Sequence, residues 1–198
     1  HPTGIDIANE ANGRLKTPQD ADWYEIDLGT NSFGQGVAVS PIQMMTAASA
    51  LANDGKMAYP HVLYGMVSNG HQYNTPAQTL GTPISPQSAR TTSEMLAIAL
   101  ENGESAALVE GYRIAGKTGT AQIPGPDGYY DPEKTHASFI GWGPVDDPKF
   151  LVYVWLEKPE SSGWASYVAA PAFHDVVEKL VVLLNIPPDN IRRQLTGQ

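Results

Sequence analysis

The chain has 198 residues, with 12 Lys and Arg against 21 Asp and Glu for a formal net charge of −9, and it contains no cysteine. This length suits one medium-sized domain with its own core, or a large part of a bigger one. The acidic balance, without any cluster of Lys or Arg, argues against a nucleic-acid partner. The lack of cysteine excludes disulfides and thiolate metal sites, and the scattered histidines do not favour a zinc site.

No stretch of the chain has the composition of a membrane span or of a targeting signal. The longest apolar run falls well short of the roughly 20 residues that a transmembrane helix needs. Residues 1–6 contain neither the basic nor the apolar region of a signal peptide. We therefore expect a piece that is soluble by itself and begins in the middle of a domain, with any membrane anchor elsewhere in a longer parent protein.

The first part of the chain is expected to hold an irregular segment, a helix and a hairpin. Residues 1–31 are polar and interrupted by Gly and Pro, which is typical of irregular structure. Ser40 is expected to cap a helix that ends near Gly55, because Ser, then Pro, then Gln three residues after the Ser form a capping box. Residues 59–68 and 71–80 are predicted strands, and the Asn-Gly pair between them is the preferred two-residue hairpin turn.

The rest of the chain is expected to form a sheet between helices. The predicted helices lie at 85–103 and 167–185, the strands at 112–122, 135–142 and 149–157, and a loop rich in Pro and Gly at 123–132. Residues 150–156 are apolar on both faces, which predicts a central strand covered on both sides by helices. The predicted class is α+β, with an antiparallel sheet flanked by helices on both faces.

Lys117 belongs to two motifs at once, and the first is a nucleotide-binding pattern. Residues 111–118 satisfy G-x-x-x-x-G-K-[ST], the P-loop. A P-loop works because a strand leads into the glycines and a helix N-terminus follows them to hold the phosphates. Here a helix at 85–103 comes before the glycines, whereas Gly and Pro follow the lysine. We therefore expect no phosphate cradle, and nucleotide binding is kept only as an alternative.

The second motif is K-T-G-T at residues 117–120, the K-T-G of serine penicillin-binding proteins and β-lactamases. Five blocks in order, over nearly the whole chain, resemble the class B penicillin-binding proteins. They are T-G-I-D at 3–6, S-F-G-Q-G at 32–36 with S-P-I-Q at 40–43, K-T-G-T-A-Q at 117–122, A-S-F-I-G-W at 137–142 and A-A-P-A-F at 169–173. The chain departs from the family after Ile7, where Ala-Asn-Glu stands in place of the usual P-G-E.

The resemblance also shows which catalytic motifs the sequence does not contain. No serine is followed three residues later by a lysine, and no S-x-N occurs anywhere. In the family both motifs lie upstream of T-G-I-D. We therefore expect residues 1–198 to be the C-terminal portion of a single transpeptidase domain, with the nucleophilic serine in the upstream part of the parent protein and no activity in the isolated chain.

The resemblance implies a serine-type D,D-transpeptidase that cross-links peptidoglycan stem peptides through an acyl-serine intermediate. Lys117 would attract the terminal carboxylate of the substrate, and the hydroxyls of Thr118 and Thr120 would hydrogen-bond it. The backbone N–H of Thr120 would stabilise the oxyanion. Gly119 would leave room for the acyl group, and the strand that ends at Gln122 would pair with the substrate as an added strand. The reaction requires no metal and no organic cofactor.

The implied partners are the stem peptide, β-lactams and the upstream part of the same domain. The isolated piece is expected to associate with itself, because it would expose an apolar face and an unpaired strand edge. The parent would be anchored upstream and would work on the extracytoplasmic face of a bacterial cell membrane. A penicillin-sensing or otherwise non-catalytic binding module of the same fold remains an alternative, because a fold does not fix a function.

Overall fold

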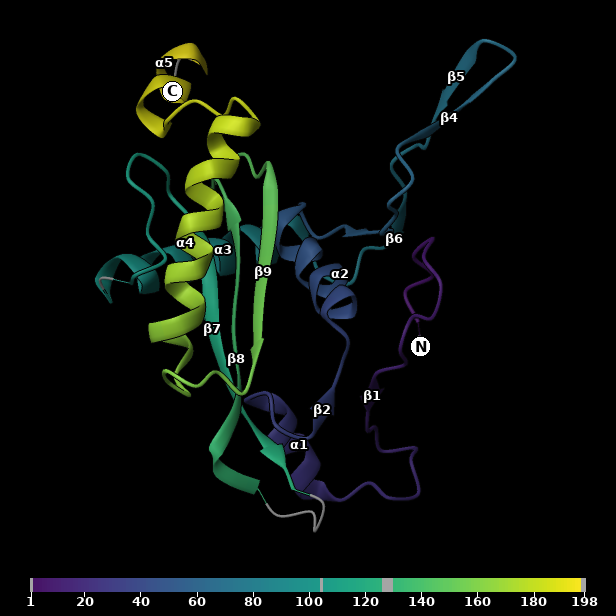
Figure 1. Ribbon diagram of the computed structural model, residues 1–198, viewed down its shortest axis with the longest axis vertical. Helices are drawn as coiled ribbons and strands as arrows, with labels where there is room; N and C mark the ends of the chain where they lie inside the picture. Colours follow the sequence, from purple (N-terminus) through teal and green to yellow (C-terminus); the bar gives the residue numbers. More distant parts are fainter. Residues whose placement is uncertain (1, 104, 126–129, 197–198) are drawn as a thin grey trace. The chain divides into compact units, whose positions relative to one another are not determined.

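The computed structural model describes residues 2–103, 105–125 and 130–196 (Figure 1). The chain divides into two compact units, His1–Ala89 and Arg90–Gln198, and each unit is described by itself. Both contain helices and antiparallel strands, which confirms the predicted α+β class. Within the described ranges no helix combines the length and the apolar character needed to cross a membrane.

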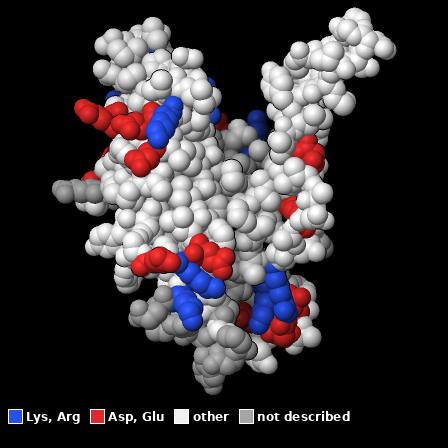
Figure 2. All heavy atoms as spheres, viewed as in Figure 1, with Lys and Arg blue, Asp and Glu red and all other residues white. Residues whose placement is uncertain are grey.

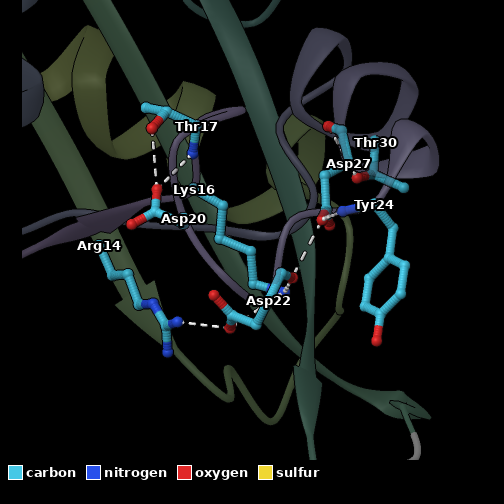
Figure 3. Close-up of polar contacts among 8 residues, drawn as sticks. All are labelled: Arg14, Lys16, Thr17, Asp20, Asp22, Tyr24, Asp27 and Thr30. Carbon is cyan, nitrogen blue, oxygen red and sulfur yellow. Dashed lines mark hydrogen bonds and ion pairs between the residues drawn. The ribbon is translucent and has the colours of Figure 1, made fainter.

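The N-terminal segment, predicted to be irregular, contains a short strand pair and a helix. β1 (Arg14–Leu15) pairs antiparallel with β2 (Val37–Ala38), and α1 (Glu25–Ser32) lies between them in the chain. The Asp27 carboxylate accepts the Tyr24 backbone N–H at 2.9 Å, which caps the helix (Figure 3). The sequence did not predict α1 because none of its residues is buried, so that it lacks an apolar face with helical spacing.

A lysine connects this helix to the preceding loop. Lys16 Nζ donates to the Asp22 carbonyl at 3.2 Å and lies 3.7 and 3.8 Å from the carboxylates of Asp22 and Asp27 (Figure 3). Arg14 also pairs with Asp22. Exposed ion pairs contribute little singly. We therefore interpret this network as local support for the loop that leads into α1.

The helix that Ser40 was expected to cap is present. In α2 (Pro41–Ala52), Ser40 Oγ accepts the Gln43 N–H at 3.3 Å, and the Gln43 side chain accepts the Ser40 N–H at 2.8 Å. This reciprocal pair is the capping box that the sequence predicts. After the helix, β3 (Met57–Ala58) pairs with β6 (Thr79–Gly81).

The predicted hairpin is also present, with shorter strands than expected. β4 (Gly65–Ser68) and β5 (His71–Asn74) pair antiparallel in continuous register. Asn69 and Gly70 both have a positive φ, at 51° and 77°, as a two-residue turn of type I′ requires. Figure 1 shows this hairpin extending beyond the β3–β6 pair.

The second unit is built on a three-stranded antiparallel sheet. Its order is β7 (Ala115–Pro124), β8 (Tyr130–Gly143) and β9 (Phe150–Glu157). β7 and β8 both reach into the predicted loop 123–132, of which residues 126–129 lie outside the described part of the chain. In the described ranges β9 pairs only with β8 and forms one edge of this sheet. The central position predicted for residues 150–156 stays a prediction for the sheet of the whole domain. A strand that is apolar on both faces can also lie at an edge when its second face is half-buried, and β9 is largely half-buried.

The core of this unit lies between the sheet and α4 (Ala165–Leu183), as Figure 1 shows. Phe139 on β8 packs against Phe173 on α4, with ring centroids 4.6 Å apart, and both side chains are fully buried. On the opposite face of the sheet, the buried Trp142 donates its indole N–H at 3.2 Å to Ser93 of α3 (Pro86–Asn102). Helices α3 and α4 thus correspond to the predicted helices 85–103 and 167–185, within about two residues at each end.

A last helix, α5 (Asp189–Thr196), follows the predicted end of α4 and was not expected. The Asp189 backbone N–H donates to Gly111 at 2.8 Å, and the Asp189 carboxylate accepts the Arg113 N–H at 2.9 Å. Arg192 then bridges Asp146 and Asp189 at 2.6 and 2.7 Å. Apart from the Asp189–Arg192 pair, these contacts join residues that are distant in sequence, so a helix this short and polar could not be predicted from its own residues.

Candidate active site

Lys117 lies inside β7, and this position overturns the P-loop alternative. The strand continues beyond the lysine to Pro124, and the next described element is again a strand, β8. Among the described residues, no helix therefore begins directly after the lysine. Without a helix N-terminus directly after them, the glycines at 111 and 116 have no array of free N–H groups with which to hold a phosphate.

β7 is an outer strand of its sheet, as the resemblance implies. It pairs with β8 from Ala115 opposite Trp142 to Pro124 opposite Tyr130, with a register shift after Gln122. No other strand pairs with β7 in the described ranges. One row of its backbone groups can therefore receive an additional strand.

The residues of the K-T-G-T motif alternate between the two faces of β7. Thr118 and Thr120 stand opposite Phe139 and Ala137, both buried under α4. Because side chains alternate along a strand, Lys117 and Gly119 belong to the opposite face. The structure therefore brings the motif residues together at the edge of the sheet, where side chains from both faces can reach an added strand.

The ammonium of Lys117 lies along this outer edge. Its side chain is exposed, and Nζ donates to the Thr118 carbonyl at 2.9 Å with Thr118 Oγ1 3.5 Å away. No carboxylate pairs with it among the described residues. A cation without a carboxylate partner beside a hydroxyl is suited to binding an anionic carboxylate.

Gly119 has a structural reason to be glycine that the sequence did not reveal. A β-carbon added at this position would lie 2.7 Å from Ser138 Oγ on the neighbouring strand. That hydroxyl donates to the Gly119 carbonyl at 3.4 Å. The glycine therefore allows Ser138 to approach β7 closely, in addition to any room that it leaves for a substrate.

Thr120 connects the motif to the start of α4. Its hydroxyl oxygen accepts the Ala165 backbone N–H at 3.3 Å, while the hydroxyl proton stays available for donation. Ala165 is the first residue of α4, so the positive end of this helix lies beside Thr120. Sequence reasoning missed this contact because the two residues are 45 positions apart and no local motif links them.

The segment before α4 is fixed at a second point, next to Gln122. Gln122 is exposed and stands opposite Thr135 on β8. The buried Thr135 hydroxyl donates to the Gly163 carbonyl at 2.8 Å. Two threonines from neighbouring strands therefore hold the chain that enters α4, which positions the helix end next to Thr120.

A charged cavity of about 360 Å³ lies beyond the start of β7, away from Thr120. Its lining residues are Glu94, Arg113, Val145, Asp146, Asp189 and Arg193. Arg113 pairs with Glu94 at 2.6 Å, and Asp146 and Asp189 both pair with Arg192. We interpret these charges as the ion-pair network that anchors α5. The described residues contain no group of three His, Cys, Asp or Glu side chains that could hold a metal ion.

Comparison with known proteins identifies the class to which this fold and edge strand belong. The family described as the penicillin-binding protein transpeptidase domain matches residues 1–178. The match covers most of the chain, including α1 to β9 and most of α4. The chain belongs to this family, which confirms the resemblance that the motifs indicated.

The curated relatives carry related names and are considerably longer. The chain is 34% identical over 195 residues to the stage V sporulation protein D of Bacillus subtilis, covering 94% of this chain and 29% of that protein. It is 32% identical to the probable peptidoglycan D,D-transpeptidase PbpC of Pseudomonas aeruginosa, and the match covers 96% of this chain and 32% of that protein. It is 30% identical to the peptidoglycan D,D-transpeptidase FtsI of Escherichia coli, and this match covers 94% of this chain and 30% of that protein. The chain thus spans about three tenths of these relatives.

Solved structures show the same fold. Penicillin-binding protein 3 of Mycobacterium tuberculosis superposes with a TM-score of 0.83 at 28% identity, covering 94% of this chain and 44% of that one. The same protein has been solved in complex with ampicillin and with aztreonam. The transpeptidase domain of penicillin-binding protein 3 from Burkholderia pseudomallei gives a TM-score of 0.80 at 30% identity, covering 94% and 54%.

Proposed function

We propose that the chain is the portion of a peptidoglycan D,D-transpeptidase that carries the substrate-docking strand of an acyl-serine active site. The observation that carries the proposal is the position of K-T-G-T on the unpaired outer edge of β7. Membership of the transpeptidase family and relatives named peptidoglycan D,D-transpeptidases support it. Residues 1–198 would then belong to one transpeptidase domain, and the nucleophilic serine would come from residues outside this sequence.

The proposed role of the edge strand is to hold an acyl-D-Ala-D-Ala stem peptide in line with that serine. An extended peptide added to β7 would be aligned by main-chain hydrogen bonds. The ammonium of Lys117 would attract the terminal carboxylate, with the Thr118 hydroxyl as a second donor, since both already lie at this edge. The Thr120 hydroxyl would keep its contact with Ala165 and use its own proton for the substrate.

The proposed chemistry runs in two balanced steps. The serine oxygen attacks the carbonyl of the penultimate D-Ala, the amide C–N bond breaks, and the terminal D-Ala leaves as an amine that has gained a proton. An amine from a second stem peptide then attacks the serine ester and releases the serine. The negative oxygen formed in each step would be stabilised by the Thr120 backbone N–H. None of these steps requires a metal or an organic cofactor.

The same site would be acylated by β-lactams, as the crystallised complexes of the mycobacterial neighbour with ampicillin and aztreonam suggest. The peptidoglycan substrate would place the parent protein at the extracytoplasmic face of the bacterial cell membrane. The parent protein, which includes the residues upstream of this chain, is therefore the object to test.

The decisive experiment measures both acylation and turnover. The parent protein is incubated with a labelled penicillin, and separately with a donor stem peptide and an acceptor amine. A transpeptidase forms the penicillin adduct and also releases D-Ala while producing cross-linked peptide. Formation of the adduct without any peptide turnover would contradict the proposal and favour the penicillin-sensing module.

A further inference from the structure

The hairpin β4–β5 lies in an unusually uncharged part of an acidic chain. Residues 57–89 contain no Lys, Arg, Asp or Glu. At the overall proportion of 17% charged residues, a stretch of this length would hold about five or six. We call the hairpin β4–β5, with Tyr64 before it, the arm. The space-filling view shows no charged side chain on the visible face of the arm (Figure 2).

The hairpin is also uncovered in the described part of the chain. β4 and β5 pair only with each other, and no other described helix or strand makes substantial contact with either. All residues of β5 and three of the four in β4 are exposed. A two-stranded hairpin by itself is marginally stable in water. Such an arm gains most stability when a partner covers one of its faces or adds a strand to it.

One face of the arm has the composition of a protein interface. Met66 stands opposite Tyr73 in the register, and Tyr64, two residues before Met66, continues the same face. These side chains are 59%, 58% and 76% exposed. Interface cores are enriched in Tyr and Met and depleted of charge, whereas monomers seldom expose contiguous apolar patches.

The tip of the arm argues against insertion into a lipid bilayer. The turn and its neighbours read Ser-Asn-Gly-His at residues 68–71, which are polar. A membrane-inserting hairpin would place its apolar side chains at the tip, whereas here Tyr64, Met66 and Tyr73 lie nearer the base. The apolar face is therefore suited to contact along its side, by an extended partner.

The two strands of the arm differ in what they offer to such a partner. β4 has apolar side chains on both faces, Met66 and Val67, while β5 is mostly polar. The outer edge of β4 contains no proline, no charge and no bulge, which are three of the devices that protect an exposed edge. We propose that β4 is a docking edge that takes an extended, uncharged segment of another protein as a third strand.

In this arrangement the segment would pair along β4 and place alternate apolar side chains against Tyr64, Met66 and Tyr73. Its lack of charge would match the arm, since a charged segment would lose solvation without gaining a partner. This inference goes beyond the proposed transpeptidase function and does not depend on it.

The test uses a displayed library of random heptapeptides selected against the intact parent protein. We expect enrichment of uncharged peptides with apolar residues at alternate positions. Val67 and Gln72 face each other in the register, so Val67→Lys and Gln72→Lys place the same charge on the same face of opposite strands. Binding of the enriched peptides should weaken about tenfold or more in Val67→Lys, and should be nearly unchanged in Gln72→Lys.

A second pair of variants tests the apolar face. Tyr64→Ser should weaken the same peptides, whereas Tyr167→Ser, which changes an equally exposed tyrosine on α4, should not. Unchanged thermal unfolding of each variant would show that the fold is intact. Three outcomes would overturn the proposal: no enriched peptide that depends on Val67, arm-dependent binding to phosphatidylcholine vesicles, or an arm-dependent dimer of the parent.

Discussion

Glycine at position 119 allows the close approach of Ser138, and in the proposed function it also leaves room for the substrate. Substitutions can separate these two roles. Gly119→Ala places a β-carbon 2.7 Å from Ser138 Oγ, which is the only heavy atom of the described residues within 4 Å apart from those of its chain neighbours. The Ser138 hydroxyl must rotate away and give up its hydrogen bond to the Gly119 carbonyl. Losing that bond costs about 0.5–1.5 kcal/mol. A strained rotamer adds up to about the same amount.

These costs are partly offset, because replacing glycine by alanine in an extended conformation reduces the entropy of the unfolded chain by about 0.4–1 kcal/mol. We therefore expect Gly119→Ala to lower the stability of the parent by about 1 kcal/mol, measured as a decrease of about 2–4 °C in the Tm of the domain. Ser138→Ala removes the clashing atom, so the double variant should regain nearly all of this loss.

A matched control lies three residues earlier in the same strand. A β-carbon at Gly116 would lie 2.8 Å from the Phe139 ring and 2.9 Å from the Ile140 carbonyl, neither of which can rotate away. Gly116→Ala should therefore cost about 1–3 kcal/mol, and Ser138→Ala should not rescue it.

Acylation by a labelled penicillin then separates the functional reason from the structural one. If β7 docks the substrate, Gly119→Ala with Ser138→Ala should still acylate at least about tenfold more slowly than the wild type, although its stability is restored. Recovery of both stability and acylation in the double variant would refute the reasoning, because Gly119 would then serve only the approach of Ser138.

Three further predictions concern the α5 anchor and the chain by itself. Burial raises the pKa of Asp146, but its hydrogen bond and ion pair with Arg192 outweigh that effect and lower the pKa below its ordinary value of 3.8. The contribution of Asp146 to stability is therefore present above pH 3.8 and is lost progressively as the pH falls further, so Asp146→Asn should lower the Tm at pH 7 and lower it less and less below pH 3.8; an effect of constant size over this range would contradict this. Residues 1–198 alone should form no covalent adduct with labelled penicillin, and a stoichiometric, denaturation-resistant label would show that the nucleophile is in this chain. The same piece should self-associate at low micromolar concentration in light scattering through the uncovered edge of β9, whereas a monomer with a cooperative thermal transition would show that it closes its own core.

Elements that depend on interactions between residues close in the sequence could be predicted. The reciprocal hydrogen bonds of Ser40 and Gln43, and the turn at Asn69 and Gly70, depend on residues a few positions apart. α4 was found because its apolar residues recur at helical spacing. In each of these cases the interacting groups are neighbours in the sequence, so that a short window contains the information.

What the sequence could not predict depends on contacts between distant residues. α5 is short and polar, and it is held by Arg113 and Asp146. The order of the sheet could not be predicted, because a strand that is apolar on both faces does not reveal whether it has one neighbour or two. At the candidate site, the motif predicted the edge strand, but the contact of Thr120 with α4 and that of Gly119 with Ser138 appear only once the strands are paired.

The central claim is that the outer edge of β7 binds the substrate through Lys117. The most direct measurement is the second-order rate of acylation of the parent protein by a labelled penicillin, compared between Lys117→Ala and Lys149→Ala. Lys149 is also an exposed lysine of this unit; it directly precedes β9, the outer strand on the opposite side of the sheet from β7, and it pairs with Asp147 at 2.7 Å. We predict that Lys117→Ala slows acylation about 10²- to 10³-fold, the usual loss for one electrostatic donor, with an unchanged Tm and with Lys149→Ala near the wild-type rate. Equal rates in both variants would contradict the claim and leave Lys117 as a surface lysine.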